Sequence, residues 1–348
     1  MPIFWEKIDF KIFGQLTTMQ HTQNSPSAAK SKTGLSDIDG AVLNPSTWLQ
    51  EVLSIPREEG YIEVEGADVH YFRWGDKSKP GIVMLHGFLS HARCFAFIAP
   101  YLAADYHVVA YDFSGMGDSG TRETYPLTVR IEELLGVVEK TGLNDNNKKP
   151  TIISHSYGGH VGVAAVEKHP EKFAGIIICD LMILRPSVLA KKAELSKPPG
   201  HQSGKRQNRI YPDYETAKQR FVLSPPQQVE QSELFDFMAF HSLKEVEGGW
   251  TWKFDPGLFN NELGADKEFS KTPRKLIKAP TRKAIIYGQE SLLFTDDSAD
   301  YMREIMAELD EADFPIIGIP LSRHHLMLDQ PIALAVALKG ILGMWAAG

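Results

Sequence analysis

Residues 151–159, TIISHSYGG, decide the fold. The stretch begins as a short apolar run, typical of a strand buried on both faces, and continues into small residues that suit the start of a helix. The pattern places Ser156 at a sharp turn between the two, where its hydroxyl is exposed near the positive end of the helix dipole. Ser154, Gly158 and Gly159 supply the small side chains that such a turn needs. We therefore predict Ser156 as a nucleophile; a glycine-rich turn with an ordinary N-cap serine is the alternative.

Strand and helix patterns alternate on both sides of this stretch. Apolar or alternating runs predict strands at 61–66, 68–75, 81–87, 107–113, 151–155, 175–180, 282–288 and 314–320. Helical spacing predicts helices at 92–103, 127–141, 298–309 and 331–346, and another directly after Ser156. This alternation predicts an α/β fold, with a mostly parallel sheet and helices on both faces.

Two segments break the rhythm and set the predicted domain boundaries. Residues 185–278 carry several prolines and the aromatic string GGWTWKFDP, so we expect an insertion over the carboxyl edge of the sheet. Residues 1–47 are predicted to be a flexible extension of a domain at 48–348, whose core comprises 60–184 and 279–348. Residues 1–16 are apolar enough to suggest a membrane or partner anchor as a less favoured alternative.

Composition narrows the functional classes. The net charge is -7, which gives no basic face for nucleic acid. The sequence has no apolar run long enough to span a membrane and no secretory signal pattern, so we expect a cytoplasmic protein. Its two cysteines, Cys94 and Cys179, lie in apolar contexts and are predicted to be buried free thiols rather than metal ligands. We expect a small-molecule partner, and neither a metal nor an organic cofactor.

From about residue 60 to the end, the chain resembles the α/β-hydrolase superfamily. The resemblance rests on four motifs in the family's order: HGF at 86–88, DFSGMGDSG at 112–120, SHSYGG at 154–159 and RHHLMLDQP at 323–331. The family usually has glycine where this chain has Ser154, a small departure. The resemblance implies an eight-stranded sheet with a lid inserted after its sixth strand.

The resemblance also assigns roles near the nucleophile. His324 matches the family's catalytic base, with His325 as the less favoured choice. The backbone N–H groups of Phe88 and Tyr157 would form the oxyanion hole. His86 is expected to brace the turn rather than to act as a catalyst. Asp112 is likewise expected to be structural, because its side chain can order the DFSGMGDSG loop through hydrogen bonds to the backbone.

The acid of the triad is the departure from the family pattern. The family most often places it after the seventh strand, where this chain has Ser291, which cannot carry a charge. Asp180, at the end of the sixth predicted strand, is the favoured acid. Glu290 is the first alternative, followed by Asp296 and Asp297.

These assignments predict a serine hydrolase that cleaves a carboxylic ester through an acyl-enzyme, in the manner of a carboxylesterase. A ligand receptor with little turnover on the same fold is the alternative, as is an enzyme that opens lactones or cleaves carbon–carbon bonds. Candidates for the substrate pocket are His86, His325, Trp250 and Trp252.

Overall fold

The computed structural model describes residues 33–189, 207–259 and 269–347. The predicted anchor at 1–16, and the predicted extension as far as residue 32, lie outside the described residues. Among the helices that are described, none combines the length and the apolar character that crossing a membrane requires.

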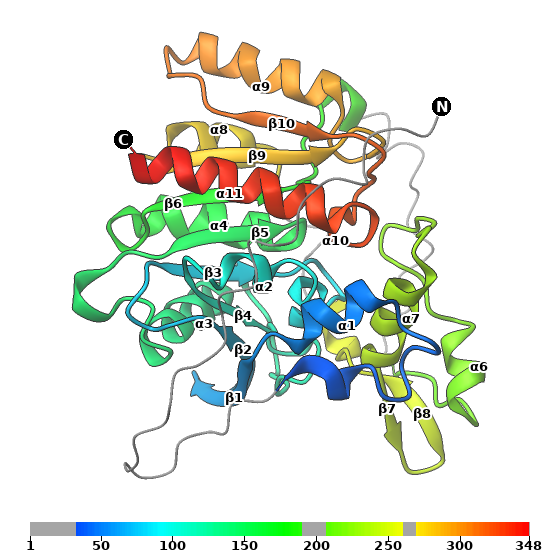
Figure 1. Ribbon diagram of the computed structural model, residues 1–348. Coiled ribbons are helices and arrows are strands. Elements are labelled where there is room, and N and C mark those ends of the chain that lie inside the picture. The colour runs from blue at the N-terminus through cyan, green and yellow to red at the C-terminus, as the bar shows by residue number, and fades with distance from the viewer. Residues whose placement is uncertain (1–32, 190–206, 260–268, 348) are drawn as a thin grey trace. The chain divides into compact units, whose positions relative to one another are not determined.

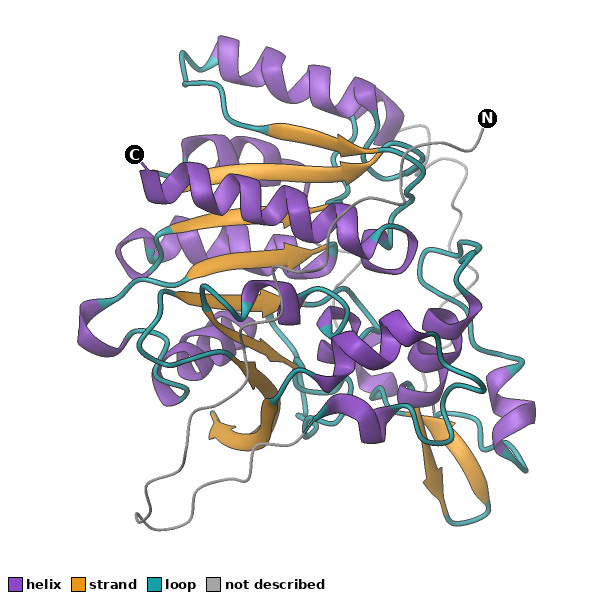
Figure 2. Ribbon diagram, viewed as in Figure 1, coloured by secondary structure: helices purple, strands orange, loops and turns teal. Residues whose placement is uncertain are grey.

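The main sheet has eight strands, as the resemblance implies (Figures 1 and 2). The strands are β1 (Arg57–Val64), β2 (Ala67–Trp74), β3 (Gly81–Leu85), β4 (His107–Tyr111), β5 (Thr151–His155), β6 (Gly175–Cys179), β9 (Arg282–Gly288) and β10 (Ile316–Ile319). Their order is β1-β2-β4-β3-β5-β6-β9-β10, and only the β1–β2 and β2–β4 pairs are antiparallel. The carboxyl ends of the parallel strands therefore share one edge, where ligands bind in sheets of this kind.

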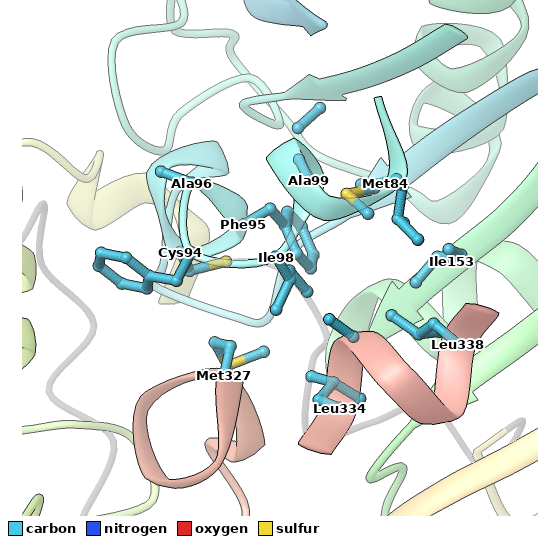
Figure 3. Packing of buried hydrophobic residues seen from close by; sticks show 14 of the residues in the cluster. Met84, Cys94, Phe95, Ala96, Ile98, Ala99, Ile153, Met327, Leu334 and Leu338 are labelled. Carbon is cyan, nitrogen blue, oxygen red and sulfur yellow. The ribbon is translucent and has the colours of Figure 1, made fainter. Parts of the chain in front are cut away.

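The central strands are buried because both of their faces carry apolar side chains. In β4, Val108 and Ala110 join one hydrophobic core, whereas Val109 and Tyr111 join the other. The first core lies between the sheet and α1, α2 and α11, and the second lies between the sheet and α3, α4, α8 and α9. Figure 3 shows part of the first core, where Phe95 and Ile98 lie toward Leu334 and Leu338 of α11.

Among the helices of these two layers, α3, α4, α9 and α11 lie where the sequence predicts helices, whereas α1, α8 and α10 were not predicted. The helices are α1 (Thr47–Ser54), α2 (Ala99–Leu102), α3 (Leu127–Lys140), α4 (Tyr157–Lys168), α8 (Thr272–Lys278), α9 (Asp296–Glu308), α10 (Leu326–Asp329) and α11 (Pro331–Ala347). Short 3-10 helices are η2 (Gly34–Asp37), η3 (Ala92–Phe95), η4 (Asp145–Asn147), η5 (Pro170–Lys172), η6 (Pro256–Phe259) and η7 (Phe269–Lys271). The helix predicted at 92–103 is instead divided into η3 and α2, because Pro100 lacks the N–H that a continuous helix needs.

Between β6 and α8 the chain adds elements outside the main sheet. They are α6 (Tyr214–Lys218), α7 (Ser232–His241) and a hairpin of β7 (Leu243–Val246) and β8 (Gly249–Trp252). α8 falls inside the predicted insertion range, but its Leu276 and Ile277 pack into the second core.

Residues 33–47, the part of the predicted extension that the structure describes, are folded rather than flexible. Ile38, Ala41 and Val42 are buried in the first core, directly after η2. Asp37 pairs with the buried Arg57 of β1 at 2.5 Å. Because these residues are packed, the folded part of the chain begins before the predicted boundary at residue 48. The prediction missed them because the segment is mostly polar and contributes only a few apolar contacts.

Candidate active site

Ser156 occupies the turn that joins β5 to α4. Its φ of 51° and ψ of -119° are unfavourable for a residue with a side chain, and such strain persists only where surrounding contacts hold it. Its N–H donates to the Cys179 carbonyl at 3.1 Å, and its side chain is partly exposed. A Cβ on Gly158 would lie 2.5 Å from the Leu85 carbonyl oxygen, so only glycine lets α4 start this close to β3. The local sequence therefore raises a serine on a strained and tightly packed bend.

Asp180 and His324 form the polar centre beside this turn. Asp180 directly follows β6 and is fully buried, and its Oδ1 accepts a hydrogen bond from Nδ1 of His324 at 2.7 Å. The carboxylate also accepts bonds from the Gly288 N–H at 2.9 Å and from the Ser291 hydroxyl at 2.7 Å. Three donors thus satisfy a carboxylate that burial alone would disfavour.

The hydrogen bond fixes the tautomer of His324. Because Nδ1 carries the donated proton, Nε2 of a neutral imidazole carries a lone pair. Nε2 is buried and has no hydrogen-bond partner among the described residues. The imidazole therefore has one nitrogen held by Asp180 and the other free to accept a proton.

Burial controls the charge of this pair. It raises the pKa of Asp180 to about 7, although the hydrogen bonds from Gly288 and Ser291 oppose the rise. It lowers the pKa of His324 to about 3, because the charged imidazolium would be poorly solvated. Burial thus favours a neutral imidazole, the form that can act as a base.

The alternative acids lie elsewhere. Glu290 forms a half-exposed ion pair with Arg323 at 3.2 Å. The carboxylates of Asp296 and Asp297 bond to the Tyr287 hydroxyl and to the guanidinium of Arg185, respectively. None of these alternative acids contacts the imidazole that Asp180 holds.

The HGF loop lies directly against the turn at Ser156. A Cβ on Gly87 would lie 3.4 Å from the Cβ of Ser156. Nδ1 of His86 donates to the Gly87 carbonyl at 2.7 Å, and its Nε2 accepts from the Phe113 N–H at 3.0 Å. The Gly87 carbonyl and the Phe88 N–H belong to one planar peptide unit, so His86 also sets the direction of that N–H.

Phe88 and Tyr157, the two predicted oxyanion donors, lie near each other. Their rings contact edge to face, with centroids 5.8 Å apart. Tyr157 is the first residue of α4, where the N–H groups have no partner within the helix. The structure thus brings both residues to the same turn.

A cavity of about 340 Å³ adjoins the turn. Its walls come from the core and from the insertion: Phe88, Leu89, Ser90, His91, Cys94, Gly117, His155, Arg220, Phe221, Val222, Leu223, Ser224, Pro226, Met238, Ser242, Trp252, Lys253, Phe254, His325, Met327 and Leu328. Two of the predicted pocket residues, His325 and Trp252, are among them. His86, the first residue of the HGF motif, is instead fully buried, and Trp250 packs against Tyr214.

Several residues of this site were not predicted as site residues from the sequence. His155 and Ser291 each bond to a residue of the His324–Asp180 pair. Phe221 and Leu223 line the cavity from an irregular segment that has no recognisable motif. Two signals were available: His155 directly precedes Ser156, and Ser291 stands where the family most often carries its acid.

A further polar cluster surrounds Asp112. His70, Asp112 and Asp118 bring ligand-type atoms within 4.8 Å of one another. However, both ring nitrogens of His70 already bond to carboxylates, at 2.8 Å to Asp112 and at 2.9 Å to Glu59. Asp112 also accepts the Asp118 N–H at 2.9 Å, so the cluster orders its loop by hydrogen bonds.

Comparisons with known proteins agree with this architecture. A model of the alpha/beta hydrolase family matches residues 82–338. A serine hydrolase-like protein of Danio rerio is 27% identical over 192 residues, which cover 52% of this chain and 57% of the relative. A serine hydrolase-like protein of Homo sapiens is 33% identical over 110 residues, which cover 31% of this chain and 52% of the relative. The chain thus spans little more than half the length of these curated relatives.

Solved structures share the fold. A thioesterase domain from the curacin biosynthetic pathway has a TM-score of 0.64 at 22% identity, covering 82% of this chain and 99% of that one. An esterase of Mycobacterium tuberculosis has a TM-score of 0.60 at 18% identity, covering 88% of this chain and 95% of that one. The family model covers well over half of the sequence, and the predicted motifs lie where the fold requires them. The chain therefore belongs to the α/β-hydrolase family.

Proposed function

We propose that the protein is a serine hydrolase that cleaves a carboxylic ester, or a related acyl bond, through Ser156, His324 and Asp180. The observation that carries the proposal is the 2.7 Å bond from His324 Nδ1 to Asp180, which leaves Nε2 as an unpartnered base among the described residues. The strained and partly exposed Ser156, whose neighbour His155 lines the cavity, supplies the nucleophile. This division of roles is what acyl transfer by a serine requires.

The reaction needs two steps. In the first, Nε2 of His324 removes the Ser156 proton while Oγ attacks the carbonyl carbon, and the imidazolium then gives that proton to the leaving alcohol. In the second, His324 takes a proton from water while the water oxygen attacks the acyl carbon, the bond from that carbon to Oγ breaks, and the imidazolium gives its proton to Oγ, which releases the acid and restores Ser156. The N–H groups of Phe88 and Tyr157 stabilise the oxyanion formed in each step.

The cavity favours an apolar acyl or alcohol group. Aromatic and aliphatic side chains form most of its walls, and none of the lining residues is a carboxylate. Its volume of about 340 Å³ is at the small end for ligand pockets. We therefore expect esters of modest size as substrates.

The proposal is tested by turnover of p-nitrophenyl acetate and butyrate by the wild type and by Ser156→Ala. We expect the wild type to hydrolyse both esters, and Ser156→Ala to lose at least ~10³-fold in kcat. A fluorophosphonate should label the wild type and not the variant. If both proteins are equally inert toward esters and label, the protein is a ligand receptor on this fold rather than a serine hydrolase.

A further inference from the structure

We infer that His155, the residue directly before the nucleophile, is a positioning residue that holds His324 in reach of Ser156. The inference rests on the proposed function, because it assigns a role within the same reaction. It identifies a contact between two segments that lie 169 residues apart in the chain.

The contact is a buried hydrogen bond. His155 is the last residue of β5 and is 1% exposed, and its Nε2 lies 2.9 Å from the backbone carbonyl of His324. A carbonyl oxygen only accepts, so Nε2 must carry the proton. The ring also packs against the His324 ring, with centroids 4.6 Å apart, and lines the cavity.

His155 stays neutral in this environment. Burial, together with the nearby His324, lowers its pKa to about 3. It therefore donates this hydrogen bond without competing for the proton that His324 exchanges with Ser156.

Together with Asp180, this contact attaches His324 at two points. Asp180 holds the ring through Nδ1, and His155 holds the backbone through the carbonyl. Within the described chain, the backbone N–H groups of Leu328 and Asp329 bond to the carbonyl of His325, not to that of His324. Since His155 and Ser156 are consecutive, the bond ties the base directly to the segment that carries the nucleophile. Displacing a catalytic group by about 1 Å can cost on the order of 100-fold in rate.

The test compares two substitutions that differ in the donor. His155→Gln retains an amide N–H near the position of Nε2, whereas His155→Phe retains a planar ring of similar size without any donor. We expect His155→Phe to lower kcat for p-nitrophenyl butyrate by roughly 10–100-fold, with KM changed by less than about threefold. His155→Gln should retain kcat to within about fivefold, which a role in packing alone would not explain. His107→Gln is the matched control, because His107 is an equally buried histidine at the opposite, amino-terminal end of β4.

Hydrogen exchange of the peptide covering residues 320–330 gives a readout that does not depend on turnover. We expect faster exchange there in His155→Phe and wild-type exchange in His155→Gln. Equal losses in both variants, or no loss in either, would overturn the inference. If the wild type hydrolyses no ester, the proposed function fails, and the exchange comparison still decides whether His155 holds the His324 segment.

Discussion

At the scale of single residues, Asp180 determines which nitrogen of His324 carries the proton. In Asp180→Asn the amide N–H would face Nδ1 and favour the other tautomer, which leaves no lone pair for Ser156. We expect kcat for p-nitrophenyl butyrate to fall at least ~100-fold, as measured by steady-state kinetics. Glu290→Gln is the control, because Glu290 pairs with Arg323, and it should remain near wild type. The opposite pattern would assign the acid to Glu290.

A second prediction for single residues concerns Ser291. Its hydroxyl donates to Oδ1 of Asp180, the same carboxylate oxygen that accepts from His324. Hydrogen bonds to a charged carboxylate lower its pKa, so Ser291→Ala should raise the pKa of Asp180 further above its usual range. Activity needs the ionised carboxylate, and it should therefore be lost at a higher pH on acidification. We expect the acid limb of the kcat/KM profile to move up by about one pH unit. Ser291→Thr keeps the hydroxyl and should leave the limb in place, whereas an unchanged limb in Ser291→Ala would contradict the argument.

At the scale of elements, the segment before β1 is anchored by a buried ion pair. Asp37 accepts from Arg57 at 2.5 Å and lies 3.4 Å from Arg93, while the Arg57 guanidinium stacks on Phe72 at 4.2 Å. Removing one partner of a buried pair typically costs about 3–5 kcal/mol, because the other charge stays buried. We expect Asp37→Ala to lower the free energy of unfolding in urea by about that amount. The double variant with Arg57→Met should recover part of the loss, and a loss below about 1 kcal/mol would show that the segment is only loosely held.

Elements and site residues differ in how well the sequence predicts them. β5 and the turn at Ser156 were predictable because a strand, a small-residue turn and a helix leave a local pattern. Helix 92–103 was only partly predictable, since Pro100 interrupts it and the resulting 3-10 geometry depends on packing. The bonds of Ser291 to Asp180 and of His155 to His324 join segments more than 100 residues apart. No local pattern encodes such contacts, so only the folded chain reveals them.

At the scale of the whole molecule, the core and the insertion share the cavity, and this division predicts its specificity. Phe88, His155 and Met327 contribute from the core, whereas Phe221 and Trp252 contribute from the insertion. Each buried CH₂ is worth about 0.8 kcal/mol, or roughly fourfold in kcat/KM, until the cavity is full. Along a series of p-nitrophenyl esters, kcat/KM should therefore rise with acyl length and then fall.

Enlarging the cavity from the insertion side should move that maximum. Trp252 lines the cavity and stacks on Phe254 with centroids 6.3 Å apart, so Trp252→Ala removes wall volume and should favour an acyl chain longer by about two to four CH₂ groups. Trp250→Ala is the matched control, because Trp250 lies on the same strand and packs against Tyr214. It should lose stability without changing the preferred length. An identical shift of the preferred acyl length in both variants would mean that either substitution changes specificity by destabilising the whole insertion. No shift in either variant would place the acyl chain outside this cavity.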